Sequence, residues 1–155
     1  MGRPVCFCGD APARRDADDA FFYGAVMARI LVADDARVVR MLIRTWLERM
    51  GHVVVEANDG AAVLSRIRDA AQAGTPFDVA FCDVNMPLLS GLQVLDAARD
   101  DAVLGATPIV LVTTLGAEAD ITRGHSRGAA AYLTKPVSYG ALVGALTALG
   151  LPVHA

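Results

Sequence analysis

Acidic, hydroxyl and basic side chains lie at the ends of four of the five short apolar runs in this chain. Asp34 and Asp35 follow the first run, Asp83 the third, Thr113 the fourth and Lys135 the fifth. Side chains at the carboxyl ends of parallel strands share one edge of a sheet, where α/β folds hold their ligands. We therefore expect these five side chains to surround one shallow pocket.

The three acids of this pocket predict a bound cation. Two carboxylates ~4 Å apart repel each other by roughly 4 kcal/mol at an effective dielectric constant of about 20. Mg²⁺ suits such a site, because it takes oxygen ligands and keeps positions open for water or phosphate oxygens. Lys135 is a compact positive charge suited to phosphate, and a carboxylate that attacks phosphorus would become an aspartyl phosphate.

Each of these residues also has a simpler interpretation when it is taken alone. Asp34 or Asp35 could cap the helix that follows, and Asp83 could be a turn residue. Thr113 could be an ordinary strand end, and Lys135 could belong to a surface turn. The combination of acidic, hydroxyl and basic side chains at four run ends favours the metal and phosphoryl chemistry.

The pattern of apolar residues predicts the elements that would position this pocket. Nearly continuous β-branched runs are typical of buried parallel strands, and they alternate here with segments that are apolar at helical spacing. Asp59 and Ser90 are expected to begin helices, and Gly51 to end one. Strands are expected at 29–33, 53–57, 78–82, 108–113 and 130–134, and helices at 36–50, 60–73, 90–100, 117–127 and 138–149. These units predict an α/β domain with a doubly wound, five-stranded parallel sheet and five helices.

Composition narrows the class of protein. Hydrophobic residues make up 54% of the chain and charged residues 20%, so a well-buried core is available. The net charge of -3 argues against a nucleic-acid partner. No apolar stretch approaches the ~18 residues of a membrane span. The three cysteines form neither a disulfide framework nor a zinc motif, which favours a reducing, cytoplasmic compartment.

One domain accounts for most of the chain. Residues 1–26 have no periodicity, and we expect a poorly ordered tail or a stretch that precedes the true start at Met27. The domain is expected to span 27–150, with a short C-terminal tail at 151–155.

Four segments together resemble the receiver domain of two-component response regulators, in particular the stand-alone, CheY-like kind. They are LVADD at 31–35, FCDVNMP at 81–87, VTT at 112–114 and YLTKP at 132–136. The segments occur in the order of that family, with thirty residues from Asp83 to Thr113 and fifty-two from Asp83 to Lys135. The resemblance implies a flavodoxin-like fold with strand order 2-1-3-4-5.

The resemblance also implies the roles of the acidic residues. Asp83 would accept a phosphoryl group from a phosphohistidine of a sensor histidine kinase or a histidine phosphotransfer protein. Asp35, Asp83 and the backbone carbonyl of Asn85 would hold Mg²⁺, and Asp34 would assist directly or through water. Lys135 would contact the phosphoryl oxygens. The protein would then be a phospho-accepting signalling domain and not an enzyme.

A conformational switch is the second implication. The Thr113 hydroxyl would move to the phosphoryl group, and Tyr132 would move inward into the space that it leaves. Pro136 would follow a cis peptide bond. The segments 117–127, 130–134 and 138–149 would form the face that contacts a downstream protein target, and we expect this face to be apolar around Val137, Tyr139, Leu142 and Leu146.

Leu115 bears on the lifetime of the phosphoryl group, and other residues bear on three alternative functions. Leu115 is apolar where an acid or amide could orient a hydrolytic water, which predicts a phosphoryl lifetime longer than in a Leu115→Glu variant. Asn85 is polar and could orient that water instead. A magnesium-dependent phosphatase with an aspartate nucleophile commonly needs a second acid two residues further on, where this chain has Asn85. A pseudo-receiver that binds partners without phosphorylation is disfavoured by the complete acid, hydroxyl and lysine set. A flavodoxin-like nucleotide binder is disfavoured by the absence of a GxGxxG motif after the first strand.

Overall fold

The sheet predicted from the apolar runs is present in the computed structural model, which describes residues 27–114, 121–123 and 126–153. Five parallel strands lie in the order β2-β1-β3-β4-β5, which is the order expected from the resemblance. The strands are β1 (Arg29–Ala33), β2 (Val53–Ala57), β3 (Val79–Asp83), β4 (Ile109–Thr114) and β5 (Ala131–Lys135). The helices with full bounds are α3 (Arg37–Arg49), α4 (Gly60–Gln72), α5 (Gly91–Arg99), α6 (Ala102–Gly105) and α8 (Tyr139–Ala148).

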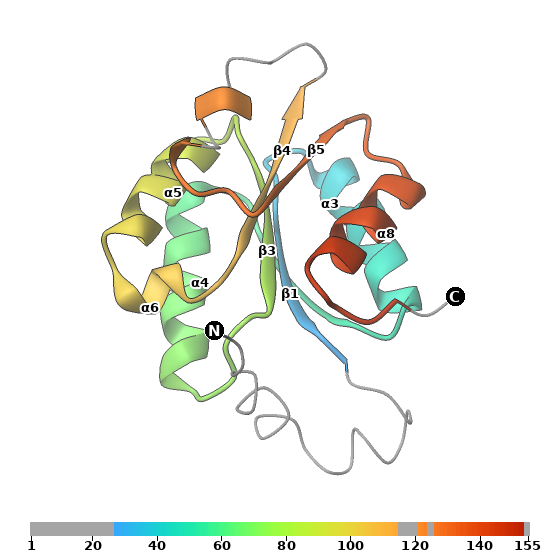
Figure 1. The fold of residues 1–155 in the computed structure, drawn as a ribbon, viewed down its shortest axis with the longest axis horizontal. Coiled ribbons are helices and arrows are strands. Elements are labelled where there is room, and N and C mark those ends of the chain that lie inside the picture. Colours follow the sequence, from blue (N-terminus) through green and yellow to red (C-terminus); the bar gives the residue numbers. More distant parts are fainter. Residues whose placement is uncertain (1–26, 115–120, 124–125, 154–155) are drawn as a thin grey trace.

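Helices cover both faces of the sheet. Figure 1 shows α4, α5 and α6 on one face and α3 and α8 on the other. All five residues of β3 are buried, as expected for the central strand of a doubly covered parallel sheet. The flavodoxin-like, doubly wound fold is therefore confirmed.

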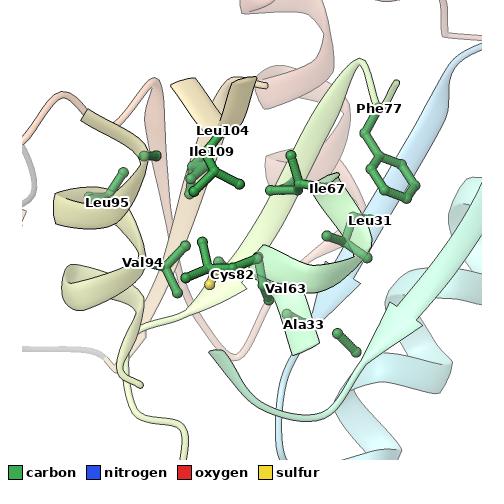
Figure 2. Packing of buried hydrophobic residues seen from close by; sticks show 14 of the residues in the cluster. Leu31, Ala33, Val63, Ile67, Phe77, Cys82, Val94, Leu95, Leu104 and Ile109 are labelled. Atoms are coloured by element: carbon green, nitrogen blue, oxygen red, sulfur yellow. The ribbon is translucent and has the colours of Figure 1, made fainter. Parts of the chain in front are cut away.

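Each face of the sheet has its own hydrophobic core. The core under α4 and α5 includes Leu31, Cys82 and Ile109 from the strands and Val63 and Val94 from the helices (Figure 2). The core under α3 and α8 takes the alternate residues of the same strands, such as Ile30 and Phe81. Because neighbouring residues of a strand point to opposite faces, the continuous apolar runs supply both cores.

The predicted helix ends are mostly confirmed. The Asp59 side chain accepts a hydrogen bond from the Ala62 N–H at the start of α4. Ser90 forms a capping box with Gln93 at the start of α5. Gly51 has a φ of 92°, which allows the chain to turn after α3.

The start of α3 shows that neither Asp34 nor Asp35 caps this helix. Its N-cap is Ala36, and no side chain caps it. Asp34 instead accepts a hydrogen bond from the N–H of Ala36 itself, at 2.8 Å to Oδ1. The two acids therefore lie in the connection before the helix and are not its cap.

Helices α3, α4, α5 and α8 are one residue shorter than predicted at one or both ends, three strands are shifted, and one helix was not predicted. Strands β3, β4 and β5 each begin and end one residue later than expected, so Asp83 and Lys135 are the last residues of their strands. The short helix α6 was not predicted. Asp101 caps it by accepting from the N–H groups of Val103 and Leu104, and one buried side chain, Leu104, anchors it.

Some predictions concern residues outside the described part of the chain. These are the expected tail at 1–26, the function of Leu115 and most of the predicted helix at 117–127, in which the described residues 121–123 and 126 are helical. In the expected C-terminal tail, Leu151 and Val153 are partly buried against the core under α3 and α8. No helix in the described ranges is both long enough and apolar enough to cross a membrane.

The expected apolar output face is partly wrong. Val137, Leu142 and Leu146 are at most 8% exposed and belong to the hydrophobic core. Tyr139 is 42% exposed and packs edge-to-face on Trp46. Helix α8 is apolar on all sides, so its sequence did not reveal which residues face the sheet.

Candidate metal centre at the carboxyl edge of the sheet

The three predicted acids lie together at one edge of the sheet. One carboxylate oxygen from each of Asp34, Asp35 and Asp83 lies within 4.8 Å of the others. Strands β1 and β3 are neighbours, and Ala33 is paired with Cys82, so the residues that follow emerge side by side. Parallel pairing of these two strands is therefore what brings the acids together.

Burial differs among the three acids. Asp34 is 1% exposed and Asp83 is 3% exposed, whereas Asp35 is exposed. Oδ1 of Asp83 accepts a hydrogen bond from the N–H of Asn85 at 3.3 Å. The loop after β3 folds back closely here, since a side chain at Gly91 would meet the Asp83 carbonyl oxygen at 2.6 Å.

Lys135 joins the cluster from the far side of β4. Its Nζ donates to Oδ2 of Asp83 at 3.1 Å. The same Nζ lies 2.9 Å from Oδ2 of Asp34, an ion pair without hydrogen-bond geometry. Lys135 is the last residue of β5, and the peptide bond to Pro136 is cis, as expected. The long lysine side chain is needed because β5 is not a neighbour of β3.

Burial and neighbouring charges shift the pKa values of Asp83, Lys135 and Cys82. Burial, followed by repulsion from Asp34, raises the pKa of Asp83 to about 6, although the bond from Lys135 opposes the shift. Burial works against the charged form of Lys135, but its contacts with the two acids prevail and raise its pKa. Burial also raises the pKa of the Cys82 thiol, so this cysteine is a core residue and not a reactive one.

The donor set fits a hard divalent cation. Oδ2 of Asp34 is buried and makes no hydrogen bond, although it forms an ion pair with Lys135 at 2.9 Å. Three carboxylates face one ammonium group, so two negative charges are uncompensated if all three acids are ionised. Oxygen donors with this charge are the ligands that Mg²⁺ takes in proteins. Asn85 is exposed beside Asp83, and the predicted use of its carbonyl as a ligand stays a prediction.

The two predicted switch residues, Thr113 and Tyr132, have partners other than the three acids. Thr113 is buried, and its hydroxyl donates to the carbonyl of Thr114 at 3.0 Å. Tyr132 packs against the core under α4 and α5, and its hydroxyl oxygen is buried. The structure therefore gathers the acids and Lys135, and it gives the Thr113 hydroxyl a backbone partner.

Two residues at this edge were missed by the sequence analysis. Arg40 donates to the Asp34 carbonyl at 2.6 Å and to Glu56 at 3.0 Å. Glu56 interrupts the apolar run of β2, and this charged residue inside a predicted strand was an available indication. The sequence held no comparable indication for Arg40, because a polar residue on an amphipathic helix is ordinarily exposed.

Comparison with known proteins identifies the family. Residues 30–147 match the family model of the response regulator receiver domain. The chain belongs to this family.

This receiver domain is similar to two proteins of Pseudomonas aeruginosa and to a chemotaxis response regulator of Vibrio cholerae. It is 35% identical to Protein PilH of Pseudomonas aeruginosa over 123 residues, which cover 79% of this chain and 98% of PilH. It is 31% identical to Protein PilG of the same organism over 120 residues, which cover 77% of this chain and 85% of PilG. The structure of chemotaxis response regulator CheY4 of Vibrio cholerae aligns with a TM-score of 0.71 at 31% identity, covering 79% of this chain and 98% of CheY4. The chain is thus a CheY-like receiver domain, and receiver domains are signalling domains.

Proposed function

We propose that this receiver domain is a switch controlled by phosphorylation of Asp83, with a sensor histidine kinase or a histidine phosphotransfer protein as the donor. The observation that carries the proposal is the position of Lys135. Its Nζ lies 3.1 Å from Asp83 and 2.9 Å from Asp34, beside a carboxylate cluster that fits a divalent cation. A lysine and three acids at one sheet edge suit phosphoryl transfer to a carboxylate.

The transfer step follows from this arrangement. A carboxylate oxygen of Asp83 attacks phosphorus and forms a P–O bond, while the P–N bond to the donor histidine breaks. The electron pair of that bond returns to the imidazole, which leaves with a proton on its other nitrogen. Lys135 donates to a phosphoryl oxygen. Asp35, Asp83 and the Asn85 carbonyl would hold Mg²⁺, with Asp34 assisting directly or through water, and the ion would offset the charge on the phosphoryl oxygens.

The switch follows from an exchange of hydrogen bonds. The Thr113 hydroxyl now donates to a neutral carbonyl, and a bond to an anionic phosphoryl oxygen is roughly twice as strong. Moving the active state from 1% to 99% requires ~5.5 kcal/mol of differential stabilisation, which several charge-assisted contacts can supply together. Tyr132 then repacks into the space that Thr113 leaves, and the face of β5 and α8 changes for a downstream protein target.

A protein donor is supported by the surface next to the acids. Val38, Met41 and Leu42 are 77%, 50% and 43% exposed and lie on the first turns of α3, directly after Asp35. Residues at spacings of three and four share one side of a helix. This apolar strip is available to a donor that brings a phosphohistidine to Asp83.

A cytoplasmic location is part of the proposal. Cys82 is a free buried thiol, which is usual in a reducing compartment. The net charge of -3 also agrees with protein partners and not with nucleic acid.

Phosphorylation of the purified protein by acetyl phosphate and MgCl₂ tests the proposal. We expect the intact mass of the wild type to increase by one phosphoryl group, and that of Asp83→Asn to stay unchanged. Asp100→Asn is the matched control, because that carboxylate is 80% exposed at the end of α5. Removal of Mg²⁺ with EDTA should abolish the gain.

The other outcomes each contradict the proposal. A gain in Asp83→Asn would place the phosphoryl group elsewhere. No gain in the wild type would favour a receiver that works without phosphorylation. Turnover of a small phosphate ester beyond one equivalent would favour a magnesium-dependent phosphatase.

A further inference from the structure

Arg40 connects the first acid of the metal centre with the edge strand of the sheet. Its side chain is 15% exposed, although it starts from the outer helix α3. Nη1 donates to the backbone carbonyl of Asp34 at 2.6 Å, and Nε donates to Oε1 of Glu56 at 3.0 Å. One side chain therefore bridges the backbone that follows β1 and a carboxylate on β2.

Other contacts also hold this segment, among them the ion pair of Asp34 with Lys135 and a bond from the Arg40 N–H to the Ala36 carbonyl at 3.1 Å. Ala36 is the N-cap of α3, and no side chain caps the helix there. The N–H of Asp34 bonds the Ala57 carbonyl at 3.3 Å, which is long for a hydrogen bond. The N–H of Ala36 bonds Oδ1 of Asp34, so this bond occupies one oxygen of a carboxylate in the acid cluster. The contact from the Arg40 side chain differs from the bond of Ala36, because it holds the backbone carbonyl of Asp34. It does not use the carboxylates of Asp34 and Asp35, which could bind a cation.

Glu56 compensates the charge of this contact. A guanidinium group beside the acids would repel a bound cation. Glu56 accepts hydrogen bonds from Arg44 at 2.6 Å and from Arg40. The bond from Arg44, then that from Arg40, lower the pKa of Glu56 against the effect of burial. Glu56 is therefore ionised at neutral pH and balances the charge of Arg40.

We propose that Arg40 is a positioning residue for the metal centre, which fixes the backbone of Asp34 and Asp35 for cation binding while Glu56 orients it and balances its charge. This inference rests on the proposed function, since it assumes that the acids bind Mg²⁺. Partners of metal ligands typically contribute ~10–100-fold in metal affinity. We expect Arg40→Ala to lower the affinity for Mg²⁺ by about 10-fold.

Calorimetric titration with Mg²⁺ tests the role of Arg40. Arg44→Ala is the matched control, because Arg44 contacts the same Glu56 but bonds Glu48 instead of the Asp34 carbonyl. We expect a weaker affinity for Arg40→Ala and little change for Arg44→Ala. Arg40→Lys, which keeps the charge and loses the two-armed geometry, should restore only part of the affinity. Equal loss in Arg40→Ala and Arg44→Ala would overturn the inference.

Two further measurements separate positioning from a general loss of stability. In Glu56→Gln the uncompensated charge of Arg40 should weaken Mg²⁺ binding at low KCl concentration, and this loss should shrink at high concentration because salt screens charges. The loss in Arg40→Ala should persist at high KCl concentration. In the metal-free protein, amide hydrogen exchange at 34–36 should be faster in Arg40→Ala than in the wild type. Unchanged exchange there would contradict a positioning role.

The titration with Mg²⁺ distinguishes failure of the proposed function from failure of the positioning role of Arg40. If the wild type does not bind Mg²⁺, the proposed function itself is wrong. If the wild type binds Mg²⁺ and Arg40→Ala binds it equally well, only the positioning role is wrong.

Discussion

The negative charge of Asp83 opposes folding when no cation is bound, and replacing Asp83 with asparagine measures this effect. Asp83 is 3% exposed and lies beside the carboxylate of Asp34. Asparagine has nearly the same shape and carries no charge. In the absence of Mg²⁺ and at neutral pH, we expect Asp83→Asn to increase the free energy of unfolding.

The magnitude follows from the pKa of Asp83. Its pKa rises from 3.8 to about 6 on folding, mainly through burial. Each unit corresponds to ~1.4 kcal/mol, so the charged form costs at most about 3 kcal/mol of stability at neutral pH. The variant also weakens the contact with Lys135, which is 3.1 Å from Asp83. We therefore expect a net gain of roughly 1–2 kcal/mol at about pH 7.5.

The sign of the pH dependence is fixed by the same shift. A carboxyl group with a raised folded-state pKa contributes stability in its protonated form, and this contribution is lost as the pH rises through about 6. The advantage of Asp83→Asn should therefore be largest at about pH 7.5 and become small at about pH 4. Mg²⁺ should stabilise the wild type at neutral pH and should have little effect on the variant.

Urea unfolding followed by tryptophan fluorescence is a suitable assay. Trp46 is the one tryptophan of the chain, and it lies on α3 and packs edge-to-face on Tyr139. Asp100→Asn, at an exposed carboxylate, controls for the loss of one negative charge. A variant no more stable than the wild type at neutral pH without Mg²⁺, or a gain that does not change with pH, would refute the electrostatic reasoning.

Three other predictions follow from the structure and the sequence. Val38→Asp, at a side chain 77% exposed, should slow phosphorylation by a phosphohistidine protein that phosphorylates the wild type and should leave phosphorylation by acetyl phosphate unchanged; equal slowing with both donors would exclude a docking role. Leu115→Glu should shorten the lifetime of the phosphoryl group measured by intact mass over time, and equal or slower hydrolysis than in the wild type would count against the role assigned to that position. Gly91→Ala should lower the free energy of unfolding by ~1–3 kcal/mol, because the new methyl group would meet the Asp83 carbonyl, whereas Gly140→Ala in open space should be neutral or stabilising.

Several elements were predictable because their signals are local. The apolar runs of β1 and β2 predicted the observed bounds, 29–33 and 53–57, although Glu56 interrupts the second run. Asp59 and Ser90 cap α4 and α5 as expected, since a cap depends on the first few residues of the helix. The last three strands were misplaced by one residue, because polar residues at their ends continue the backbone pairing without continuing the apolar pattern. Helix α6 was missed because one turn is too short to show a period.

Side-chain partners depended on contacts between distant segments. Burial of Leu142 and Leu146 could not be predicted, because α8 is apolar on all sides and only packing against β5 selects its inner face. The bond of the Thr113 hydroxyl to the Thr114 carbonyl depends on one side-chain rotamer, which the sequence does not specify.

The order of residue types along the chain determined which chemistry the sheet edge could support: acids after the first and third strands and a lysine after the fifth. That information is local, since it needs only the apolar pattern and the residues that end each run. The pairing of β1 with β3 and the reach of Lys135 across β4 decided which atoms meet. The tertiary structure also decided the bridge from Arg40 to Glu56, because sixteen positions separate these residues and only the folded chain brings them within 3.0 Å.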